Sequence, residues 1–153
     1  FLTLFGDRIL FDVVQDGDCR SILGWETTFF DILSTKAKQF GFWSRLPDGK
    51  RLCCIGDEPC NPACERFIED ADWLLCEAFC LYADRERFRP YEKHHSTVKE
   101  ACELAQRLKV KNLVLWHTED KTYEQRRARY TAEGKEYFSG NLLVPQDLEV
   151  IAL

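Results

Sequence analysis

Two apolar runs of this chain end in side chains that can bind a metal ion. Asp57 follows the run at 52–55 after Gly56, and His117 directly follows the run at 113–116. Parallel strands end at the same edge of a sheet, so side chains that follow such runs can meet there. A carboxylate and an imidazole are typical ligands of a divalent metal ion. On spacing alone a turn or a helix cap is the simpler interpretation of Asp57. A lone histidine is usually a satisfied surface or core residue, but the apolar strand before His117 raises the ligand interpretation.

Two further positions carry groups that move or orient protons. His94 and His95 precede a helical segment, whose free N–H groups favour an anion such as a phosphate, and a histidine there can donate to a leaving oxygen. Adjacent side chains point apart, so we expect only one of His94 and His95 to serve a site. The alternative is that both belong to a polar region that caps the helix. Glu77 ends the apolar run at 73–76 and could orient His95 or a metal-bound water, or form a salt bridge at the strand end.

The apolar pattern predicts the elements that would position these groups. The helix at 96–108 has one apolar face, with Ser96 or Thr97 as its cap and Glu100 in solvent. The arginines at 126–129 are expected on a solvated helix face. We expect hairpins at 2–14 and 39–55, strands at 25–33, 72–76, 112–116 and 148–153, and helices at 64–69, 96–108 and 120–136. Hairpins followed by alternating strands and helices indicate an α/β unit with helices on one face of its sheet.

The length, composition and net charge of the chain restrict the class of protein. The chain has 153 residues, 45% of them hydrophobic, enough for one domain with a core. Its net charge of −5 argues against unspecific nucleic-acid binding, and no apolar run reaches the roughly 18 to 20 residues of a membrane span. The eight cysteines lack zinc-knuckle spacing, so we expect buried reduced thiols and a cytoplasmic location. Because the chain begins at Phe1 and contains no Met, we expect it to be processed or partial.

The order of these motifs resembles the C-terminal half of the metallo-β-lactamase fold, in the ribonuclease Z-like branch. The matching segments, from residue 25 to the C-terminus, are Gly56-Asp57-Glu58-Pro59, the run from Ala71 to Ala78, His95-Ser96-Thr97 and the run from Leu113 to His117. The resemblance implies an α/β fold that is half of an αββα sandwich, with a mixed sheet and helices on one face. Residues 1–153 would form the C-terminal half of a single domain.

The resemblance also implies a function and a role for each candidate residue. Asp57 matches the metal-bridging aspartate and His117 the last histidine ligand of two divalent ions, expected to be zinc. His95 matches the histidine that assists at the scissile phosphate, and Glu77 a motif glutamate, although Cys76 stands where relatives often have histidine. The implied activity is hydrolysis of a phosphodiester or related ester by a metal-activated water.

Three features of the family have no counterpart in this sequence. The His-x-His-x-Asp-His motif of the N-terminal half is absent, and so is the middle histidine expected near 32–36, before the strand containing Gly41. We therefore expect the chain to be inactive alone, with its open sheet face covered by the missing half, a partner chain or a second copy in a homo-oligomer. Between Lys38 and Asp57 there is no room for the arm with which bacterial ribonuclease Z grips transfer RNA. Nucleic acid stays open as a substrate.

Two alternatives come from other classes. The chain could be a non-enzymatic α/β interaction module whose histidines are incidental. It could also hold a thiol-based site built from cysteines at 60, 64, 76 and 80.

Overall fold

The computed structural model describes residues 10–153. Its strands are β1 (Cys19–Ile22), β2 (Trp25–Asp31), β3 (Phe40–Arg45), β4 (Arg51–Cys54), β5 (Trp73–Glu77), β6 (Asn112–Trp116) and β7 (Asn141–Leu143). Its helices are α1 (Arg85–Phe88), α2 (Val98–Arg107) and α3 (Tyr123–Tyr137), with short 3₁₀ helices η3 (Pro62–Phe67), η4 (Tyr82–Asp84) and η5 (Tyr91–Lys93). Most of the predicted hairpin at 2–14 lies outside the described residues, and 10–14 form no strand.

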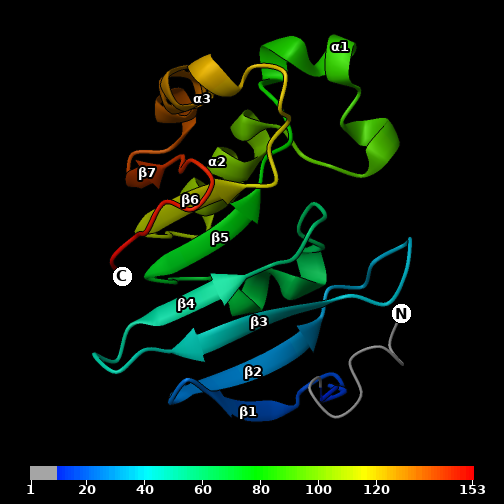
Figure 1. The fold of residues 1–153 in the computed structure, drawn as a ribbon, viewed down its shortest axis with the longest axis vertical. Coiled ribbons are helices and arrows are strands. Elements are labelled where there is room, and N and C mark those ends of the chain that lie inside the picture. The colour runs from blue at the N-terminus through cyan, green and yellow to red at the C-terminus, as the bar shows by residue number, and fades with distance from the viewer. Residues whose placement is uncertain (1–9) are drawn as a thin grey trace.

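The strands form one mixed sheet in sequential order (Figure 1). Strands β1 to β4 pair antiparallel, and the predicted hairpin of β3 and β4 is confirmed. Strands β4 to β7 then pair parallel, each joined to the next through a helical segment. The carboxyl ends of β4, β5 and β6 therefore lie at one edge of the sheet.

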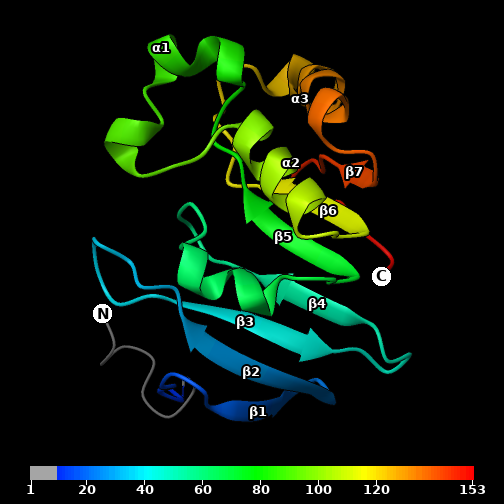
Figure 2. The same ribbon diagram turned by 180° about the vertical axis from the view of Figure 1, so that it is seen from behind.

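Helices cover one face of this sheet, as predicted. Right-handed crossovers that advance in one direction along a sheet place their helices on the same face. Residues from η3, α2 and α3 share one core with the strands, and Figure 2 shows η3 and α2 in front of β4 to β6. Ala101 of α2 and Tyr130 of α3 are buried against Leu74 and Leu113.

The other face carries a smaller apolar cluster. Leu52, Trp73 and Val114 are buried there, while Trp25, Phe42, Leu75 and Leu143 are half-buried. No helix of the described residues packs on this cluster, which agrees with the prediction of a sheet face that needs a cover.

The strand predicted at 148–153 is wrong. Strand β7 at 141–143 pairs with β6 instead, and the later segment runs as coil with Ile151 against the smaller cluster. Leu148 is fully exposed and has a left-handed backbone (φ 65°), which interrupts an extended strand.

The start of α2 resolves the choice between two caps. Thr97 is the cap: its hydroxyl accepts the Glu100 N–H, and the Glu100 carboxylate accepts from the Thr97 N–H at 2.8 Å. Glu100, predicted in solvent, is half-buried and its carboxylate is engaged in this reciprocal capping box.

Candidate metal centre

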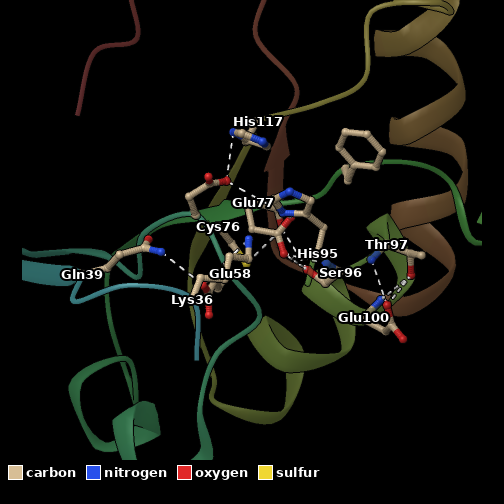
Figure 3. A network of polar contacts seen from close by, with 12 residues as sticks. Lys36, Gln39, Glu58, Cys76, Glu77, His95, Ser96, Thr97, Glu100 and His117 are labelled. Carbon is tan, nitrogen blue, oxygen red and sulfur yellow. Dashed lines mark hydrogen bonds and ion pairs between the residues drawn. The ribbon is translucent and has the colours of Figure 1, made fainter. Parts of the chain in front are cut away.

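The carboxyl edge of the parallel strands brings the four predicted site residues together. Asp57, Glu77 and His117 come from the ends of β4, β5 and β6. A parallel bridge between Cys80 and Thr97 ties the segment after β5 to the start of α2, and this pairing carries His95 to the same edge. Figure 3 shows Glu77, His95 and His117 turned toward one another.

Three of these side chains offer ligand atoms within 4.8 Å of one another: Asp57, His95 and His117. The Asp57 Oδ1 atom lies 2.9 Å from His117 Nδ1 and 3.8 Å from His95 Nδ1. The two imidazole rings are 4.8 Å apart between centroids. Within residues 10–153 this is the one group of three His, Cys, Asp or Glu residues with such spacing.

The donor atoms of this group fit a cation. Asp57 Oδ1 and His95 Nδ1 are buried, and neither has a hydrogen-bond partner among the described residues. Asp57 Oδ1 is close to His117 Nδ1 but does not meet the geometry of a hydrogen bond with it. Buried acceptors without a donor are costly, and a carboxylate oxygen beside imidazole nitrogens is a set that a divalent metal ion can satisfy.

Glu77 lies beneath His95 in the interior. Its side chain is fully buried, and Oε1 accepts hydrogen bonds from the Ser96 N–H and hydroxyl, each at 2.6 Å. The other oxygen, Oε2, has no hydrogen-bond partner and lies 3.6 Å from His95 Nδ1. Burial raises the pKa of Glu77 to about 7, although the Ser96 hydrogen bonds oppose that rise. Ser96 therefore fixes a carboxyl that can carry a proton at neutral pH.

The His95 ring has a fixed environment. It stacks on Phe79, with centroids 5.2 Å apart and planes at 19°, and burial lowers the pKa of His95. His94 is exposed with a left-handed backbone (φ 57°) and is not in the group. Of the two adjacent histidines only His95 lies in the group, as expected for side chains that point apart.

The segment after β6 is held by a buried arginine. His117 itself has a left-handed backbone (φ 50°), a conformation that costs energy in a residue other than glycine. Arg126 is 4% exposed and donates to the Thr118 hydroxyl and, at 3.4 Å, to the Glu119 carbonyl. The prediction that this arginine is solvated was wrong, because α3 turns it toward the segment that carries His117.

Sequence reasoning missed the contacts that stabilise the site. Phe79 stacks on His95, and Ser96 donates to Glu77, through contacts between loop residues. The residue types phenylalanine and serine do not predict such contacts. Glu58 is another example: its buried carboxylate accepts from the Ser34 hydroxyl at 2.7 Å and the Gln39 amide at 3.1 Å. Those hydrogen bonds fix the loop before β3. This loop contains the segment at 32–36, where the family has a histidine and this chain has none.

The cysteines are free thiols. Six are buried, Cys60 is half-buried and Cys19 is exposed, as the prediction of reduced thiols requires. Burial raises the pKa of Cys60 to about 12, so its thiol stays protonated at neutral pH. No cysteine belongs to a ligand group of three within residues 10–153, which speaks against the thiol-based alternative.

None of the helices in the described part of the chain is both long and apolar enough to cross a membrane.

Comparison with known proteins finds ribonuclease Z among the curated relatives of the chain. No family model matches the chain. Ribonuclease Z of Thermococcus sibiricus is 39% identical over 109 residues, which are 69% of this chain and 32% of that protein. The chain thus spans about a third of the length of this curated relative.

Solved structures agree with the fold. The metallo-β-lactamase fold protein YhfI from Bacillus subtilis matches with a TM-score of 0.68 and 18% identity, over 87% of this chain and 52% of that one. The short form of human tRNase Z matches with a TM-score of 0.61 and 23% identity, over 84% of this chain and 43% of that one. The expected resemblance is confirmed for these shares of the chain.

Proposed function

Since this chain has the metallo-β-lactamase fold and is homologous to part of ribonuclease Z, we propose that it supplies half of the active site of a metal-dependent hydrolase of phosphodiesters or related esters. The observation that carries the proposal is the group of Asp57, His95 and His117 at the carboxyl edge of the parallel strands. Its buried acceptor atoms have no hydrogen-bond partners among the described residues, as a cation site requires.

Asp57 and His117 are the residues that would hold the metal. We propose two divalent ions, zinc by preference, which when bound supply an activated water nucleophile and polarise the attacked centre. The side chains of Asp57 and His117 suit this role because Asp57 Oδ1 lies 2.9 Å from His117 Nδ1.

His95 would act on the departing oxygen. Its Nδ1 atom faces Glu77 and Asp57, at 3.6 and 3.8 Å, which leaves Nε2 to donate a proton. Glu77 is then a positioning residue, because its carboxyl, fixed by Ser96, sets the orientation and tautomer of the imidazole.

The open sheet face fits a domain of which this chain forms one half. We propose that the rest of such a domain packs on the half-buried side chains of Trp25, Phe42, Leu75 and Leu143. A partner chain or a second copy of this chain is the alternative cover. The relatives are named for RNA processing, but β3 and β4 are joined by the tight turn at 46–50, without an arm that could grip transfer RNA.

Elemental mass spectrometry of the purified chain tests the metal centre. We expect one or two divalent ions per chain, lost in His117→Ala and Asp57→Ala. His94→Ala is the matched control, because His94 is exposed and outside the group. Equal, non-zero metal content in all four proteins contradicts the proposal and favours the interaction module with incidental histidines, whereas no metal in any of them means that this half of the site does not hold an ion without its other ligands.

A further inference from the structure

A pocket with three arginines, the arginine pocket, lies at the opposite end of the sheet from the proposed metal centre. It has a volume of about 450 Å³ and is lined by Trp43, Arg45, Arg51, Arg66, Glu69 and Asp70. Strand β4 begins in this pocket at Arg51 and runs to Cys54, before Asp57 at the other edge of the sheet. The arginine pocket is therefore separate from the metal centre, and an inference drawn from it does not depend on the proposed function.

Strand pairing and the short helix η3 bring the three arginines together. Arg45, the last residue of β3, pairs directly with Arg51, the first residue of β4. Trp43 lies two residues before Arg45, on the same face of β3, and packs against the larger core. Arg66 comes from η3, with its guanidinium 4.8 Å from the centre of the Phe67 ring. Guanidinium groups from three elements thus line one cavity.

The protein does not neutralise these guanidinium groups. Four arginines of residues 10–153 form no ion pair, and three of the four line this pocket. The Arg51 guanidinium donates to the Glu69 carbonyl, a neutral acceptor, and its Nε–H is buried without a hydrogen-bond partner. The carboxylates of Glu69 and Asp70 belong to exposed residues, and neither pairs with an arginine.

This arrangement of charges is unfavourable without an anion. Like charges directly opposite each other destabilise an antiparallel strand pair, and Arg45 and Arg51 have this relation. The neighbouring pair, Ser44 and Leu52, is buried, so the register of the two strands holds the arginines opposite each other. A bound anion would replace this repulsion with attraction to both side chains, which is the physical reason to expect a ligand here.

We propose that the arginine pocket binds a phosphate group, either free or at the end of a small molecule. A guanidinium donates through a planar fork that matches the oxygens of a carboxylate or a phosphate. The two oxygens of a carboxylate lie in one plane and suit one fork. A tetrahedral phosphate offers oxygens in several directions, to forks that come from β3, β4 and η3. The volume of about 450 Å³ lies in the range of small-molecule sites and leaves space for an organic group beside Trp43.

Isothermal titration calorimetry with inorganic phosphate tests the pocket in the full chain. The chain is first freed of metal with a chelator and desalted, because a metal ion also binds phosphate. Arg51→Gln and Arg66→Gln should each weaken binding about tenfold to a hundredfold, because each removes hydrogen bonds between charged groups. Arg87→Gln is the matched control for Arg66→Gln and should bind as the unmodified chain does. Arg87 is also exposed and also lies 4.8 Å from a phenylalanine ring, but it lines a different pocket.

Two further probes, acetate and phenyl phosphate, define the ligand at the same ionic strength. Acetate should not bind, because a planar monoanion suits one fork only. Phenyl phosphate that binds more tightly than inorganic phosphate assigns the site to a small molecule with a group beside Trp43, and equal affinity assigns it to free phosphate.

Urea unfolding tests the repulsion between the paired arginines. Without phosphate, Arg45→Gln should unfold at a higher urea concentration than the unmodified chain, because it removes one of two opposed charges. Phosphate should raise the urea midpoint of the unmodified chain more than that of Arg45→Gln. Three results overturn the proposal: a chain that binds no phosphate, equal binding of acetate and phosphate, or phosphate binding that Arg51→Gln and Arg66→Gln leave unchanged.

Discussion

Replacing Glu77 with glutamine should make the metal-free chain more stable at neutral and alkaline pH. Burial raises the pKa of Glu77 from 4.5 to about 7, so the native state holds this proton more tightly than the unfolded chain does. The stability that comes from the protonated carboxyl is complete below pH 4.5 and is lost as the pH rises through about 7. Glutamine stays neutral throughout, and its Oε1 can still accept both Ser96 hydrogen bonds.

The size of the effect follows from the difference between the two pKa values. From 4.5 to about 7, at about 1.4 kcal/mol per pH unit, the chain loses about 3 to 4 kcal/mol of unfolding free energy. The side chain is fully buried, so solvent does not screen this loss. Glu77→Gln should thus remove most of the decline in stability between pH 5 and 8 that comes from this residue.

Urea unfolding in the presence of a chelator measures the difference. The unfolding free energies of the unmodified chain and of Glu77→Gln are compared at pH 5, 6, 7 and 8, with Glu136→Gln as an exposed control on α3. We expect the two curves to diverge with rising pH, in favour of Glu77→Gln, while Glu136→Gln runs parallel to the unmodified chain. Parallel curves for Glu77→Gln, or a variant that is less stable at pH 8, would refute the assignment of a buried carboxyl with a raised pKa.

Four further outcomes follow from the described contacts. Thr97→Ala removes the capping hydroxyl of α2 and should lower stability by about 1–2 kcal/mol in urea unfolding, with Thr97→Ser retaining most of it. Gly41→Ala places a Cβ atom 2.7 Å from the Cys54 carbonyl oxygen and 2.6 Å from the Phe30 ring, so it should lower the free energy of unfolding by about 1–3 kcal/mol. The isolated chain should bind a hydrophobic dye or self-associate through the smaller apolar cluster. A monomer that does not raise the fluorescence of the dye contradicts this. Iodoacetamide at pH 8 should modify exposed Cys19 before Cys60, because burial raises the pKa of Cys60 to about 12; peptide mass spectrometry checks the order.

The elements that depend on burial could be predicted from sequence. The apolar run at 112–116 became β6 with the predicted bounds, because a strand between two covered neighbours is buried along most of its length. The apolar periodicity of α2 likewise matches its buried face of Val98, Ala101, Cys102 and Ala105. The proximity of Asp57 and His117 agrees with their positions after two apolar runs, although spacing alone favoured a turn or a cap for Asp57.

The elements that are held mainly by backbone pairing could not be predicted from the sequence. Strand β1 is largely exposed and carries polar residues, so it has no apolar signature; it is held by its hydrogen-bonded pairing with β2. Strand β7 spans three residues, too short for any periodicity, while the alternation at 148–153 belongs to a coil. The roles of Ser96 and Phe79 depend on how a loop returns to the end of β5, and only the three-dimensional path of that loop reveals them.

The unfavourable features near the strand ends favour a metal centre over an interaction module with incidental histidines. Three of the five buried side-chain atoms without a hydrogen-bond partner in residues 10–153 lie in this one site: Asp57 Oδ1, Glu77 Oε2 and His95 Nδ1. Each such atom costs about 1–3 kcal/mol, and the left-handed backbone of His117 adds to that cost. A bound cation would satisfy Asp57 Oδ1 and would stabilise the fold more the more tightly it binds. An interaction module with incidental histidines gains nothing from these costs, whereas a centre built for a metal requires acceptors that no proton donor has satisfied beforehand.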